Sequence, residues 1–143
     1  MPLTFNLFHD SALTQPITSV NPLTATQDGG VLLGAVDKTI YLGSTTSTNK
    51  LQVTASPGVN PLIVSIVDAA SGTGAPSTEY KLALTSGGLA TAVAGASLTL
   101  GATINGGVAN AVPIFTRRTS AITAPGAYSD ISINVATPYE SPI

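Results

Sequence analysis

The stretch that decides the fold reads Leu-Gln-Val-Thr-Ala at 51–55, where apolar side chains alternate with polar ones. The same period of two returns in Tyr-Lys-Leu-Ala-Leu at 80–84, in the apolar positions of 98–104, and in Ile-Ser-Ile-Asn-Val at 131–135. Such alternation is typical of β-strands that bury one face and leave the other open. No window holds a helical period over about ten residues. The sequence therefore predicts an all-β protein.

Turn residues divide the chain into short strands, since it holds 14 glycines and 10 prolines. Strands that recur at short spacings are typical of an antiparallel β-sandwich or a jelly roll, and we expect about eight of them. The expected strand segments are 3–8, 17–26, 38–43, 50–56, 61–68, 78–85, 96–104, 108–116 and 128–137.

Two segments carry more specific expectations. Asn105 and Gly106 lie between two alternating runs and predict a two-residue turn that joins 96–104 and 108–116 as a hairpin. Residues 61–67 are apolar on both faces. They form either a central strand or a strand whose outer face a partner covers.

The chain has 143 residues, which fits a single domain. We divide it into an N-terminal arm or edge strand at 1–15, one β-sandwich domain at 16–137 and a C-terminal tail at 138–143. A strand at 3–8 has apolar groups on both faces, and a free strand of that kind is an aggregation hazard. It is either the first strand of its own sandwich or an arm added to the sheet edge of a neighbour.

The composition favours contact with other proteins. Only 8% of the residues are charged, against about 25% in an ordinary soluble domain. A free monomer usually keeps charges on its surface, so a chain with so few is expected to lie against neighbours. Five cationic residues and a net charge of −2 give no basic patch, and tryptophan is absent. We therefore expect no nucleic-acid partner.

The sequence also shows no signal for export and no segment for membrane insertion. It has no cysteine, so it forms neither a disulfide framework nor a cysteine zinc site. Residues 1–10 lack the basic region and long apolar run of a signal peptide, and no apolar run reaches the length of a membrane span. We expect synthesis in the cytoplasm and no membrane partner.

The sequence contains no recognisable set of catalytic residues. His9 is the single histidine, and on a strand the neighbouring Asp10 would point the opposite way and could not orient it. The seven carboxylates form no calcium-loop pattern, and no phosphate-binding glycine loop is present. We expect no enzymatic activity, no catalytic residue, no metal site and no cofactor.

Arg117 and Arg118 form the one cluster of like charges. Either the strand has ended and both side chains are solvated, or they form a fork that reaches a partner subunit. Together with the apolar ends of the chain they give the expected interface, which consists of Leu3, Phe5, Leu7, Phe8, Arg117, Arg118, Tyr139 and Ile143.

The segment 111–139 resembles the end of spore-coat-U-type pilin domains. Gly126, Tyr128 and Asp130 fit a pattern that precedes the last, alternating strand of those immunoglobulin-like sandwiches. The resemblance implies a sandwich and a structural role. Those pilins are exported and usually disulfide-bonded, and this cysteine-free chain departs from them in both respects.

In overall style, a cysteine-free β-sandwich rich in threonine, alanine and glycine resembles capsid decoration, or cement, proteins of tailed bacteriophages. That resemblance implies a homo-oligomer, with a homotrimer favoured, that binds the major capsid protein or another virion protein at the capsid surface. The alternatives are a tail, fibre or pilus-like structural subunit and a small lectin-like binding module.

Overall fold

Short β-strands carry nearly all of the regular structure. The computed structural model describes residues 3–25, 35–70, 72, 74–119 and 129–143. Over these residues the chain contains no α-helix, and three single 3-10 turns lie at η1 (Ser77–Glu79), η2 (Gly87–Ala90) and η3 (Val108–Asn110). The strands are β1 (Asn6–Phe8), β2 (Val36–Gly43), β3 (Asn49–Val53), β4 (Ile63–Asp68), β5 (Tyr80–Ala83), β6 (Leu98–Thr99), β7 (Ile104–Asn105), β8 (Val112–Arg118), β9 (Ile131–Val135) and β10 (Pro138–Pro142).

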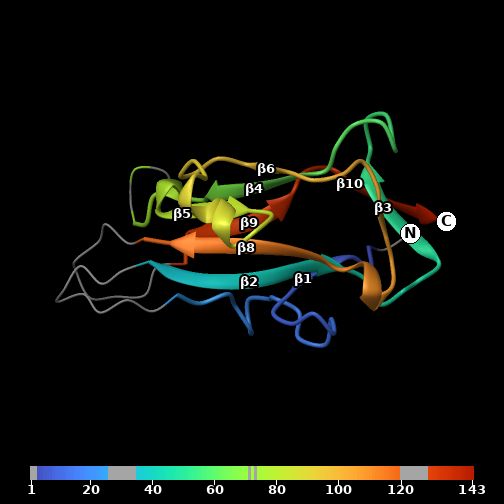
Figure 1. Ribbon diagram of the computed structural model, residues 1–143, viewed down its shortest axis with the longest axis horizontal. Coiled ribbons are helices and arrows are strands. Elements are labelled where there is room, and N and C mark those ends of the chain that lie inside the picture. Colours follow the sequence, from blue (N-terminus) through green and yellow to red (C-terminus); the bar gives the residue numbers. More distant parts are fainter. Residues whose placement is uncertain (1–2, 26–34, 71, 73, 120–128) are drawn as a thin grey trace.

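The strands pair into three antiparallel sheets. The largest has the order β1-β2-β8-β5, and two three-stranded sheets have the orders β10-β3-β7 and β6-β4-β9. In Figure 1, β2 and β8 run along the long axis, whereas β3 and β10 lie toward one end of it. The expectation of an antiparallel all-β fold is confirmed, and the arrangement is compatible with a β-sandwich.

One apolar core joins the three sheets. Ile40 on β2 and Ile114 on β8 stand opposite each other in the register and are fully buried. Leu51 on β3 and Val64 on β4 are buried at 1% and 0% exposure in the same cluster. Alternation brings these side chains together, because every second residue of each strand faces inward. Burial of a side chain of this size contributes about 1.5–3 kcal/mol.

The strand at Ile63–Asp68 is central. β4 pairs with β6 on one side and with β9 on the other. A strand in that position needs apolar side chains on much of its surface, which explains the apolar run at 61–67. The interpretation of this run as a central strand is confirmed.

The predicted hairpin at Asn105 and Gly106 is wrong. Asn105 ends β7 and pairs with Lys50 on β3, and β8 pairs instead with β2 and β5. Gly106 does not adopt a positive φ; its N–H donates to the carbonyl of Asn49 at 2.7 Å, and a Cβ on it would overlap the carbonyl oxygen of Thr46. Glycine is needed here for close backbone approach, and this long-range pairing outweighs the local turn preference.

Other boundaries differ for similar reasons. Residues 17–25, the described part of the expected strand 17–26, form no strand; the segment follows the outer edge of β1, where Pro16 bridges Phe8. Proline lacks the N–H that a ladder needs. The expected strand 96–104 is split into β6 and β7. Residues 138–142, assigned to a tail, form β10, which pairs with β3 over its whole length.

Candidate interaction surface

An apolar groove runs between the β1 side of the largest sheet and β9. It consists of two adjoining cavities of about 320 and 430 Å³. Leu7, Ile17, Ile133 and Asn134 line both cavities, so the two form one continuous surface. Among the residues that the structure describes, no carboxylate, lysine or arginine lines either of them.

Three separate parts of the chain build the walls of the groove. β1 and the segment that follows its outer edge supply Leu7, Ile17 and Leu23, while β9 supplies Ile131 and Ile133. Ile133 packs against the core yet remains half-buried, because the groove leaves part of it uncovered. An uncharged surface of this kind can bind another apolar chain through burial.

A polar network beside the groove joins the two ends of the described chain. The buried carboxylate of Glu140 on β10 accepts hydrogen bonds from the N–H and the hydroxyl of Thr4, both at 2.6 Å, and from the amide of Asn49 at 2.7 Å. Burial alone would raise the pKa of Glu140, but these hydrogen bonds outweigh it and hold the pKa below its ordinary value of 4.5. Glu140 therefore fixes the entry to β1 while remaining charged.

The two arginines bind carboxylates of their own chain. β8 continues through both residues, so their side chains point to opposite faces of the sheet. Arg117 makes a bidentate contact with Asp37 at 2.8 and 2.9 Å, and its hydrogen bond lowers the pKa of the Asp37 carboxyl. This pair is exposed, with 29% and 49% of the two side chains accessible.

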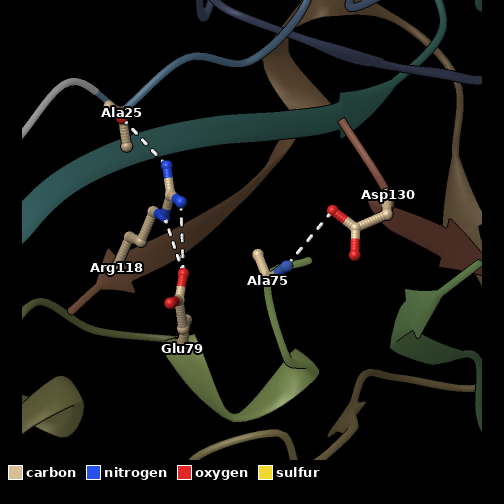
Figure 2. Close-up of polar contacts among 5 residues, drawn as sticks. All are labelled: Ala25, Ala75, Glu79, Arg118 and Asp130. Carbon is tan, nitrogen blue, oxygen red and sulfur yellow. Dashed lines mark hydrogen bonds and ion pairs between the residues drawn. The ribbon is translucent and has the colours of Figure 1, made fainter. Parts of the chain in front are cut away.

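Arg118 lies in a buried pair, shown in Figure 2. Its Nε and Nη2 lie 3.2 and 3.1 Å from Oε2 of Glu79, and Nη1 donates to the carbonyl of Ala25 at 3.0 Å. Only 14% of the Arg118 side chain and 2% of the Glu79 side chain are exposed. Both arginines are thus occupied within the chain, which neither of the two sequence-based interpretations anticipated.

Asp130, the third residue of the pilin-like pattern, points toward the turn that precedes η1 (Figure 2). Its Oδ1 accepts a hydrogen bond from the N–H of Ala75 at 3.5 Å, and no hydrogen-bond donor reaches the buried Oδ2 in the described part of the chain. Gly74 has a φ of +71° and a Cβ on it would stand 2.8 Å from Oδ2. Gly126 and Tyr128 lie outside the described residues.

His9 and Asp10 do not form a catalytic pair. Nε2 of His9 lies 3.0 Å from the carbonyl oxygen of Asn21. The carboxylate of Asp10 accepts hydrogen bonds from the hydroxyl and N–H of Thr14 and from the N–H of Gln15, and the Thr14 hydroxyl lowers the pKa of Asp10. Asp10 therefore organises the loop that follows β1.

The residues expected at the interface fall into four groups. Leu3, Tyr139 and Ile143 are exposed at 47%, 45% and 66%, respectively. Phe5 and Phe8 belong to the core, and the half-buried Leu7 lines the groove. The two arginines hold their ion pairs. The structure thus leaves Leu3, Leu7, Tyr139 and Ile143 accessible for contact.

Sequence reasoning did not identify the groove side of β9. The signal there is the alternation at 131–135, which predicts a strand but does not indicate which surface the strand borders. The exposed Val20, Val59 and Val93 were also missed, because an isolated valine in a turn has no pattern that distinguishes it from a core residue.

Comparisons give no identity to this surface. Across the described ranges, no group of three or more histidine, aspartate or glutamate side chains could hold a metal ion. No helix in the same ranges is long and apolar enough to span a membrane. No protein-family model, no curated protein and no solved structure matches the chain.

Proposed function

We propose that this chain is a viral structural protein that binds other protein subunits, and specifically a tailed-phage capsid decoration protein that stabilises capsomer junctions on the outer shell. It catalyses no reaction and uses no cofactor. Its partner is the major capsid protein or another virion protein.

The observation that carries the proposal is the uncharged apolar groove between β1 and β9 on a chain with 8% charged residues. Apolar surface gains about 25 cal/mol for each Å² removed from water, without any charged partner. A protein that binds in this way can hold neighbouring subunits together.

Exposed apolar side chains at the chain ends add a second contact region. Tyr139 lies on β10, and Ile143 follows it, held by a hydrogen bond of its N–H to the carbonyl of Thr48 at 2.9 Å. A tyrosine with an apolar ring and a polar hydroxyl is well suited to a protein interface. Both side chains are presented by a paired backbone, so little conformational entropy is lost on binding.

The test is co-sedimentation of the purified chain with capsid shells of the encoding phage, stripped of their decoration. The wild-type chain should bind at saturable sites, and the double variant Tyr139→Ser/Ile143→Ser should bind at least about tenfold more weakly. Val93→Ser is the matched control, since Val93 is an exposed apolar residue on the distant η2–β6 segment. Binding should change little with salt, because few charges contribute.

Other outcomes would point to the alternatives. Failure of the wild-type chain to bind the shells, together with polymerisation of the chain alone, would identify a tail, fibre or pilus-like subunit. Failure to bind shells together with saturable glycan binding would identify a lectin-like module. Equal binding of the double variant would exclude the chain ends from the contact.

A further inference from the structure

The outer edge of β9 has backbone groups available for pairing. Within the β4–β9 ladder, the N–H of Ala69 donates to the carbonyl of Asp130 at 2.8 Å, and the N–H of Ala136 donates to the carbonyl of Ile63 at 3.0 Å. Hydrogen bonding to one neighbour alternates along an antiparallel strand, so the even-numbered residues of β9 bond to β4. The N–H and C=O groups of Ile131, Ile133 and Val135 therefore point away from β4, and no described strand pairs with them.

The composition of β9 leaves this edge unprotected. β9 contains neither a charged residue nor a proline, and its odd positions carry β-branched side chains that favour sheet pairing. The side chains of Ser132 and Asn134 are exposed, and those of Ile131, Ile133 and Val135 are half-buried beside the groove.

β10, an edge strand of equal length, is protected. Thr54 donates to the carbonyl of Thr137 and Ile143 donates to that of Thr48, so the odd-numbered residues bond to β3. The outward positions are Pro138, Glu140 and Pro142, and the two prolines have no N–H to offer.

The edges of the largest sheet are also partly closed. The carbonyl of Leu7 on β1 accepts the N–H of Ile17 at 2.8 Å, and the carbonyl of Tyr80 on β5 accepts that of Gly95 at 2.8 Å. The outer strands β6 and β7 contain two residues each. In the described part of the chain, β9 is therefore the long edge strand that lacks such protection.

We infer that β9 pairs edge to edge with β9 of a second copy of this chain, antiparallel and centred on Ile133. This arrangement joins two β6-β4-β9 sheets into one continuous sheet with two-fold symmetry. It uses the β9 side of the groove, so a dimer would bind a shell through the groove surface on the β1 side and through the exposed Tyr139 and Ile143. It differs from the trimer expected from the sequence.

The pairing is self-complementary in register. Ile133 stands opposite Ile133 of the partner subunit, and Ile131 stands opposite Val135 of the partner subunit, so every outward N–H meets an outward C=O. Cross-strand pairs of β-branched side chains stabilise such a ladder and would cover the part of Ile133 that the groove leaves exposed.

Charge and polarity also agree with a second copy as the occupant. On the exposed face Ser132 stands opposite Asn134 of the partner subunit, a neutral pair that can form a hydrogen bond. The Asp130 residues of the two copies lie at opposite ends of the paired segment, about 20 Å apart at 3.4 Å per residue, so their charges do not oppose pairing. A two-fold contact needs a surface that complements itself, and β9 meets this condition.

The test measures the mass of the full chain by analytical ultracentrifugation over a concentration series. The wild-type chain should form a dimer at micromolar concentrations. The double variant Ser132→Lys/Asn134→Lys places lysines opposite each other across the pair on the exposed face, and it should weaken the dimer at least about tenfold. The matched control is Ser97→Lys/Thr99→Lys, which adds the same charges at two exposed positions, one just before β6 and one on it, at the opposite edge of the sheet.

A rescue experiment isolates the contact. Mixing the lysine variant with Ser132→Glu/Asn134→Glu should restore a heterodimer, since each lysine then faces a glutamate. Amide exchange at Ile133 should slow as the wild-type dimer forms. A monomeric wild-type chain, or an oligomer that persists in the lysine variant, would overturn the inference. Capsid binding is measured separately by co-sedimentation, so failure of the dimer and failure of shell binding are distinguishable.

Discussion

The backbone N–H of Thr4 donates to Oε2 of Glu140 at 2.6 Å, across 136 positions of the sequence. This contact places the segment before β1 against β10. In a chain without cysteine, it provides a non-covalent link between regions near the two ends.

Glu140→Gln tests the strength of this link. The NH₂ group of the glutamine side chain would face the Thr4 and Asn49 donors, which now donate to a carboxylate oxygen. The free energy of unfolding should therefore fall by about 1.5–3 kcal/mol. Urea denaturation measures the change. Asp37→Asn removes an exposed carboxylate and should leave stability near that of the wild-type chain. Equal effects of the two variants would contradict a special role for Glu140.

The same carboxylate should make stability depend on pH. The pKa of Glu140 is lower in the folded chain than its ordinary value of 4.5, so its contribution is complete above that value and is lost as the pH falls through the folded pKa. Urea midpoints measured from neutral pH to below 4.5 should therefore decline. The decline should be shallower in Glu140→Gln, and identical slopes would contradict this assignment.

Arg118→Ala should destabilise the fold far more than Arg117→Ala. Arg118 forms an ion pair with a carboxylate that is only 2% exposed, and removing one partner of a buried ion pair typically costs about 3–5 kcal/mol. The exposed Arg117 can be replaced with little effect on stability. Thermal and urea unfolding of the two variants provide the comparison, and a similar effect of both would show that burial does not distinguish the pairs.

Gly106→Ala should destabilise the chain by about 1–3 kcal/mol, because the new methyl group meets the carbonyl oxygen of Thr46. Gly87→Ala is the control, as nothing lies within 4 Å of a Cβ at that position. The control should be neutral or slightly stabilising in thermal unfolding. Tolerance of alanine at 106 would argue against the close approach of the two backbones.

Deletion of residues 1–10 should prevent stable folding. Phe5 and Phe8 are buried at 6% and 7% exposure, and β1 pairs with β2 of its own chain. Losing two buried aromatic side chains costs more than a marginally stable domain can tolerate. Far-UV circular dichroism and thermal melting measure the result. A truncated chain that folds normally would show that the segment acts as an arm.

The sequence predicted strand locations better than strand partners. Alternation reports which side chains face inward, so the segments containing Leu51 and Ile133 were correctly predicted as strands. The apolar run around Val64 was correctly predicted as a central strand. Pairing depends on contacts between distant segments. The local turn signal at Asn105 therefore predicted a hairpin, whereas Asn105 pairs with Lys50 on β3. For the candidate site, the groove residues come from three separate segments, and no local pattern indicates that these segments meet.

The arginine pair illustrates the same limit. The sequence shows Arg117 and Arg118 only as a cluster of like charges. It could not show that Asp37 on β2 lies beside Arg117, or that Glu79 on η1 lies beside Arg118, because only the fold brings these distant residues together. The eight expected interface residues therefore included two that are engaged within the chain.

The prolines of β10 affect how large an assembly can become. If the chain pairs through β9, that edge is used up once two copies have met. A third copy cannot pair in the same way with β10, the other five-residue edge strand, because Pro138 and Pro142 have no N–H to donate. The joined sheet therefore contains two copies and does not grow further by edge pairing. This limit matters for a protein with few charges, because little electrostatic repulsion keeps its copies apart.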